Sequence, residues 1–116
     1  MSIVPKLFNY ELISYPRHIY HCMINGHALS GDMKSALFVL DSMKGNGGGA
    51  DVAPNALTYA TLCKGFALQG DMEGVASAEK MCSEGGMALD DGDYLEVIEA
   101  LCDGGHKEHV SKVLAR

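Results

Sequence analysis

Apolar positions recur along the chain at intervals of three and four residues, the spacing that places side chains on one face of an α-helix. Three stretches carry this pattern in one phase: Tyr20, Met23, Ile24 and His27; Tyr59, Leu62, Cys63 and Phe66; Tyr94, Val97, Ile98 and Leu101. Alternating apolar and polar runs, which indicate strands, are nearly absent. The pattern therefore predicts an all-α chain.

Part of the amino-acid sequence that carries this helical pattern also occurs twice in similar form. INGHALSGDM, residues 24–33, returns as CKGFALQGDM, residues 63–72. The step from Tyr20 to Tyr59 is 39 residues and the next step is 35, with the surplus in the glycine-rich segment 45–51. Glycines make a flexible insertion of low entropic cost. Self-similarity at a fixed period is the mark of repeat architectures.

Each unit predicts a first helix that ends at a glycine, because glycine adopts the left-handed conformation after a helix without steric cost. The three glycines in this position are Gly31, Gly70 and Gly105. Thr58 and Asp93 stand where an N-cap belongs, and Glu96 follows Asp93 by three residues, as in a capping box.

A second helix follows each glycine. The predicted second helices are 33–44, 72–83 and 107–115. Asp32 and Asp71 come directly before the first two and are placed to cap them. Met33, Ala36, Leu37, Leu40 and Met43 supply the apolar stripe of the helix at 33–44.

The expected fold is a right-handed α-α superhelix, a solenoid of helix-turn-helix units that forms part of a longer array. We divide the chain into the tail of a preceding repeat and three repeats. The tail spans 1–16, with its last helical turns at 7–14. The first repeat spans 17–55 with an insertion at 45–51, the second spans 56–90, and the truncated third spans 91–116.

Small residues occupy one slot in all three first helices. Gly26, Gly65 and Ala100 share this position, where a small side chain lets a partner helix pack closely. The four cysteines are spread widely with no CxxC pair, so we expect reduced, buried thiols rather than disulfides or a zinc site: Cys22, Cys63, Cys82 and Cys102.

Composition limits the partners. Nine Lys plus Arg against 15 Asp plus Glu give a net charge of −6, which argues against strong non-specific attraction to nucleic acid or anionic membranes. No apolar run approaches the roughly 20 residues of a membrane span, so no membrane partner is expected.

The unit 56–90 resembles a pentatricopeptide repeat. That family begins its unit with Thr-Tyr, places an apolar pair three and four residues after the Tyr and a Gly eleven after it, and often closes with Pro-Asp. The matches here are Thr58, Tyr59, Leu62, Cys63, Gly70 and Asp90, and the preceding unit closes with Pro54-Asn55. The resemblance extends over residues 17–116 in three units that are in phase.

The resemblance implies binding of single-stranded RNA, one base per repeat. It assigns base reading to the residue after the Tyr and to the last residue of the unit, and base stacking to the residue two before the Tyr. Together with Lys64, which is placed to meet a phosphate, the implied RNA-binding residues are His18, His21, Asn55, Leu57, Ala60, Asp90 and Leu95. Because Ala60 and Leu95 offer only van der Waals contact, we expect sequence-tolerant contact along one section of a longer groove.

In sequence, residues 17–40 resemble most the leucine-rich members of that family from animal mitochondria. This likeness implies a longer parent chain, a mitochondrial location, and binding and stabilisation of messenger RNA together with a small RNA-binding partner protein.

Other functions find less support in the sequence. His18, His21 and Cys22 share a helix face but lack the fourth ligand and second element of a closed zinc site. His106 and His109 are expected to be solvated at a helix start. No order of Ser, His, Asp or Cys indicates catalysis, so no enzyme activity and no cofactor are expected. The open alternative is a protein-interaction scaffold, because related helical repeats hold peptides in the same groove.

Overall fold

The computed structural model describes residues 17–45 and 53–115. Within these ranges the chain is helical and contains no strand, which confirms the all-α solenoid of helix pairs. The helices are α2 (Arg17–Leu29), α3 (Met33–Gly45), α4 (Ala56–Leu68), α5 (Met72–Glu84), α6 (Asp91–Asp103) and α7 (Val110–Leu114), with the 3-10 turn η2 (Lys107–His109) before α7. In the described part of the chain, none of them has the length and apolar character needed to cross a bilayer.

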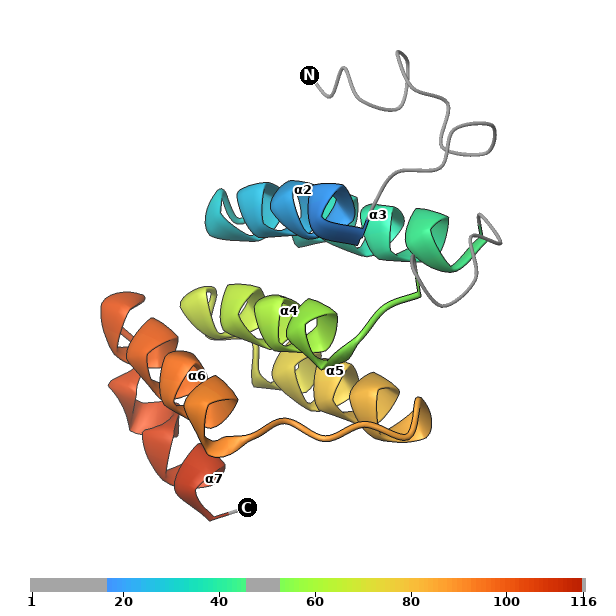
Figure 1. Cartoon of the computed structure of the whole chain (residues 1–116). Helices are drawn as coiled ribbons and strands as arrows, with labels where there is room; N and C mark the ends of the chain where they lie inside the picture. The colour runs from blue at the N-terminus through green and yellow to red at the C-terminus, as the bar shows by residue number, and fades with distance from the viewer. Residues whose placement is uncertain (1–16, 46–52, 116) are drawn as a thin grey trace.

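Successive helix pairs lie side by side (Figure 1). The first helices of the pairs pack on one another, α4 against both α2 and α6, whereas α3 and α5 pack mainly against their own first helices. The arrangement makes α4 the central helix of the described part, and eight of its residues are buried.

Two turns between paired helices are fixed by hydrogen bonds. At the end of α4, Gly70 has φ +74, its N–H donates to Ala67 O, and the Asp71 N–H donates to Phe66 O. This is a Schellman ending. The Asp71 side chain then caps α5 by accepting from Gly74 N at 2.9 Å. Gly31 and Asp32 repeat the arrangement before α3, so the predicted glycine ends and aspartate caps are confirmed.

The predicted N-caps of α4 and α6 were wrong by one turn. The caps are Asn55 and Asp90, whose side chains accept from the backbone N–H groups of Thr58 and Asp93. Thr58 and Asp93 occupy the third helical position, and their side-chain oxygens accept a hydrogen bond from the backbone N–H of the cap, which completes two capping boxes. Glu96 takes no part in them.

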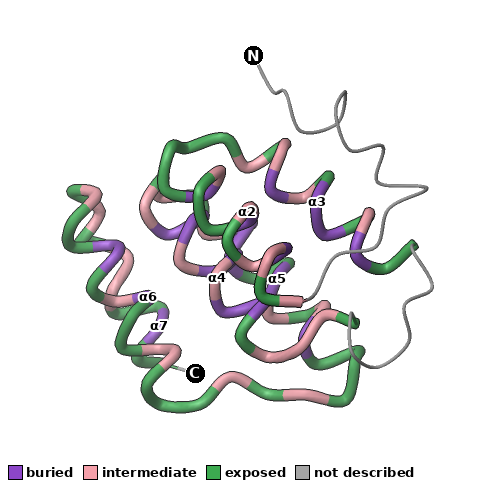
Figure 2. Tube along the Cα trace, turned by 45° about the horizontal axis from the view of Figure 1, so that its top comes forward, coloured by how far each residue is buried: buried purple, intermediate pink, exposed green. Residues whose placement is uncertain are grey.

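The buried apolar side chains form one core cluster to which all six helices contribute, and Figure 2 shows the buried positions recurring along the helices. Its largest fully buried side chains include Tyr20, Ile24, Leu40, Met43, Leu62 and Leu101. The predicted apolar face is therefore the buried face, although Met23, His27, Tyr94 and Ile98 are only half-buried.

In the small-residue slot, neighbouring side chains pack closely on Gly65, whereas no described residue lies close to Gly26. A Cβ added at Gly65 would lie 2.6 Å from Ala28 Cβ and 2.8 Å from Met33 Sδ, so the close approach there comes from the preceding helix pair rather than from α5. A Cβ added at Gly26 would meet nothing within 4 Å among the described residues. Within the described residues, the predicted close packing is therefore seen at Gly65 and not at Gly26.

The cysteines divide into two classes. Cys63 and Cys82 are buried, and burial raises the pKa of the Cys82 thiol. Cys22 and Cys102 are exposed, contrary to the prediction of four buried thiols. Both lie on first helices that have only one first-helix neighbour in the described part of the chain.

The third pair differs from the other two. Its predicted second helix at 107–115 begins as the 3-10 turn η2 and continues as the short α7. His106 lies against Gly70, where an added Cβ would meet its ring at 2.6 Å, and His109 is half-buried with its Nδ1 enclosed, so the expectation of two solvated histidines was wrong. The predicted helical turns at 7–14 and insertion residues 46–51 lie outside the described residues.

Candidate nucleic-acid interface

Each first helix presents a row of four exposed or half-buried residues away from the centre of its buried face, and Leu68, the last of the α4 row, packs against the core. The spacing of four, three and four places each row on one stripe of its helix. We call these rows together the outer stripe: His18, Cys22, Asn25 and Leu29 of α2; Leu57, Thr61, Lys64 and Leu68 of α4; Gly92, Glu96, Glu99 and Asp103 of α6. All of them are exposed or half-buried, and His18, Leu57 and Lys64 are among the predicted RNA-binding residues.

Two predicted reading residues meet beside this stripe through a third side chain. His21 of α2 places Nε2 2.5 Å from Thr58 Oγ1 of α4. The Thr58 hydroxyl in turn donates to Asn55 Oδ1 at 3.1 Å and accepts from the Asn55 N–H at 3.0 Å. The helix cap of α4 and the reading residue of α2 therefore form one polar network across the boundary between two repeats.

The hydrogen bonds of the capping box favour one tautomer of His21. With the Thr58 hydroxyl donating to Asn55 Oδ1, His21 Nε2 donates to Thr58 Oγ1 and Nδ1 carries the acceptor lone pair of the neutral ring. Burial lowers the pKa of His21 from its usual value of 6.5, and electrostatic repulsion from Arg17 and His18 lowers it further. The neutral form of the ring is therefore favoured in the folded chain.

The two cap residues each keep one polar atom available. Asn55 Oδ1 is occupied by the Thr58 backbone and hydroxyl, while no hydrogen bond within residues 17–45 and 53–115 uses Asn55 Nδ2. Asp90 Oδ1 accepts from Asp93 N at 2.8 Å, and across the same residues Asp90 Oδ2 has no protein donor. Asn55 thus keeps a donor, and Asp90 keeps an acceptor.

The remaining predicted residues offer a ligand van der Waals or stacking contact rather than hydrogen bonds. Leu57 and Leu95 each leave 56% of their surface exposed, whereas Ala60 leaves 9%. His18 is exposed at the start of α2 and presents an aromatic ring. Ala60, at the position that corresponds to His21, has no polar side-chain atom that could repeat the histidine contact.

Lys64 is engaged in an ion pair. Its Nζ lies 3.9 Å from Glu96 Oε1 of α6, and both side chains remain partly exposed. This carboxylate competes with a phosphate for the ammonium group.

Three residues make tertiary contacts that the sequence did not predict. Thr58 was taken only as a cap, although its hydroxyl joins the two repeats. Arg17 donates through Nε to Ala53 O at 2.9 Å and so ties the start of α2 to the segment before α4. Glu96 was taken only as a capping residue. Since each contact depends on how two helices register, the spacing along one helix gives no signal for it.

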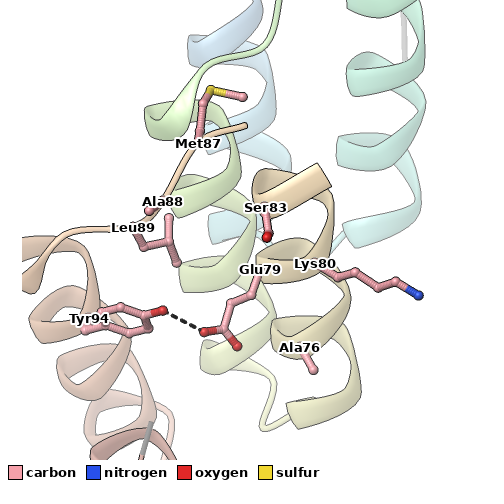
Figure 3. Close-up of a pocket in the computed structure, with 8 residues that line it drawn as sticks. All are labelled: Ala76, Glu79, Lys80, Ser83, Met87, Ala88, Leu89 and Tyr94. Atoms are coloured by element: carbon pink, nitrogen blue, oxygen red, sulfur yellow. Dashed lines mark hydrogen bonds between the residues drawn. The ribbon is translucent and has the colours of Figure 1, made fainter. Parts of the chain in front are cut away.

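An open depression of about 500 Å³ lies between α5 and the segment that leads to α6 (Figure 3). Tyr94 and Glu79 face each other across it, with the Tyr94 hydroxyl donating to Glu79 Oε2 at 2.9 Å. None of the predicted RNA-binding residues lines this depression. Its hydrogen bond fastens α6 to α5.

The described residues do not provide the geometry that a metal site requires. Within them, no group of three or more His, Cys, Asp or Glu side chains is arranged to hold a metal ion. His21, one of the three candidate ligands at the start of α2, uses its Nε2 for Thr58 instead.

Two comparisons with known proteins match this chain. Residues 18–48 match the family model of the PPR repeat. The chain is 30% identical over 115 residues to a pentatricopeptide repeat-containing protein of Arabidopsis thaliana, and the match covers 90% of this chain and 22% of that protein. The chain therefore spans about a fifth of the length of this curated relative. No solved structure gives a significant match. Both sequence matches support the pentatricopeptide repeat family for this helical solenoid.

Proposed function

We propose that the chain is a segment of a pentatricopeptide repeat protein that binds single-stranded RNA along the outer stripe, with the polar side chains at the repeat boundaries facing the bases. The observation that supports this most is the network of His21, Thr58 and Asn55. It holds a donor and a ring nitrogen in fixed positions beside the exposed ring of His18.

The available atoms suggest how bases would be distinguished. Asn55 Nδ2 can donate to a base nitrogen that carries a lone pair, such as N1 of adenine or N3 of cytosine. The free oxygen of Asp90 can accept from N3–H of uracil or N1–H of guanine. Stacking on His18 adds roughly 1–3 kcal/mol for one base without regard to its identity.

The larger setting of the segment belongs to this proposal as well. A parent protein of many repeats fits the 22% of the Arabidopsis relative that the chain covers. Mitochondrial location, stabilisation of messenger RNA and a small RNA-binding partner protein follow from the likeness of residues 17–40 to leucine-rich family members of animal mitochondria, and from nothing else. The relative found by comparison is a plant protein.

The test is the binding of fluorescently labelled single-stranded RNA by the 116-residue chain during a salt titration. Single strands lose affinity with a slope of about 0.7 in log K against log salt for each phosphate contact. Since the described outer stripe carries one lysine, and that lysine is paired with Glu96, we expect binding at low salt with a shallow slope. Absence of binding at low salt would exclude RNA as the ligand of this segment.

A protein-interaction scaffold is the second candidate, and two observations favour it. Leu57 and Leu95 are large apolar side chains that are each 56% exposed, and the net charge is −6. An apolar or basic peptide segment would suit such a surface better than a polyanion. Failure to bind RNA combined with saturable binding of a peptide would favour this function.

A further inference from the structure

The outer stripe changes its charge from one repeat to the next. In α2 its four residues carry no acidic group, and in α4 they include Lys64. In α6 they include Glu96, Glu99 and Asp103, all exposed. Every acidic residue of these three first helices belongs to α6: Asp91, Asp93, Glu96, Glu99 and Asp103.

We infer that Glu96, in the acidic row of α6, acts as a competing anion that masks Lys64 from the phosphates of a bound RNA. This inference rests on the proposed function. Three carboxylates on one helical stripe repel phosphates that follow the same line, and the nearest of them is paired with Lys64 at 3.9 Å. A phosphate that binds Lys64 must first displace Glu96.

The geometry makes Glu96 removable without loss of the fold. Its side chain is 59% exposed, and it takes no part in the capping box of α6. An exposed ion pair of this kind contributes little to stability. Its effect on a phosphate ligand is direct, because the same ammonium group cannot pair with both anions.

The experiment compares the wild-type chain with Glu96→Gln in binding of a labelled single-stranded oligo(U) during a salt titration. We expect Glu96→Gln to bind about two- to five-fold more tightly at low salt, the range set by a surface ion pair. The salt slope should steepen by about 0.7 as Lys64 gains a phosphate. Glu96→Gln/Glu99→Gln should bind more tightly still.

Two controls separate a local effect from a change of net charge. Glu84→Gln removes one negative charge from an exposed residue at the end of α5, away from the outer stripe, and should leave affinity and slope unchanged. Lys64→Gln should abolish the gain from Glu96→Gln when the two are combined, because the gain requires the lysine.

The outcomes distinguish the inference from the proposed function. Measurable RNA binding that is equal in wild type, Glu96→Gln and Glu84→Gln overturns the inference alone. An equal gain in Glu96→Gln and Glu84→Gln also overturns it, since only net charge would then matter. No binding by any of the variants at low salt overturns the proposed function and the inference together.

Discussion

His21 Nε2 of α2 lies 2.5 Å from Thr58 Oγ1 of α4, so a hydrogen bond crosses the boundary between two repeats. The same hydroxyl belongs to the capping box that starts α4. The beginning of one repeat is therefore built partly on the side chain of the repeat before it.

Thr58→Val tests this relationship, because it keeps the shape of the side chain and removes the hydroxyl. The Asn55 N–H and the His21 Nε2–H both lose their acceptor, and Thr58 is fully buried. We expect the free energy of unfolding to fall by about 1–3 kcal/mol, measured by urea denaturation. Thr61→Val on the same helix loses only a bond to the Leu57 carbonyl at an exposed site and should change stability by less than about 0.5 kcal/mol.

The lowered pKa of His21 predicts a pH dependence of stability. Below pH 6.5 the unfolded chain gains a proton at this residue, whereas the folded chain gains it only at lower pH. The contribution of His21 to the free energy of unfolding is therefore full above pH 6.5 and falls as the pH drops from 6.5 toward the folded pKa. His21→Gln should show a weaker loss of stability over that window. An NMR titration that gave His21 a midpoint at or above 6.5 would contradict this prediction.

Base preference should follow the free atom at each helix cap. Asp90→Asn keeps an efficient N-cap and exchanges an acceptor for a donor, so preference at one nucleotide should move from uracil or guanine toward adenine or cytosine. Asn55→Asp should shift the preference at another nucleotide in the opposite direction. Binding to oligonucleotides that differ at a single base measures both effects.

Asp91→Asn is the matched control for Asp90→Asn, since it removes the same charge from the adjacent exposed residue. It should alter neither preference nor stability by more than about 1 kcal/mol. If Asp90→Asn and Asp91→Asn behave alike, Asp90 is a helix cap without a reading role.

Two glycines in the same slot should respond differently to alanine. Both substitutions gain the same helix propensity, about 1 kcal/mol. Gly65→Ala also forces a Cβ to 2.6 Å from Ala28 Cβ, whereas Gly26→Ala meets nothing within 4 Å in the described chain. Gly65→Ala should therefore be less stable than Gly26→Ala by about 1–3 kcal/mol in thermal or urea unfolding. Equal stabilities would mean that α2 and α4 can separate at no cost.

The sequence predicted what depends on one helix or one turn. Helix positions, the glycine ends at Gly31 and Gly70, and the aspartate caps at Asp32 and Asp71 all follow from local spacing. The caps of α4 and α6 were misplaced because a capping box contains two suitable residues three apart, and either can be mistaken for the cap.

Contacts between repeats could not be predicted in this way. The bond from His21 to Thr58, the pair of Lys64 and Glu96 and the exposure of Cys22 and Cys102 depend on the register of neighbouring helices and on how many neighbours each helix has. A periodic pattern says which face is apolar, but it does not say which side chain of the next unit stands opposite.

The turn at Gly70 and Asp71 has a mechanical consequence. Since Asp71 both closes α4 and caps α5, these two helices cannot change their mutual angle without breaking hydrogen bonds at 2.9 Å on either side of one residue. The helix pair then behaves as a rigid unit, and changes of curvature fall to the linkers between pairs, such as the segment 85–90. If bound RNA bends the array, we expect these linkers to change conformation while each helix pair keeps its internal geometry.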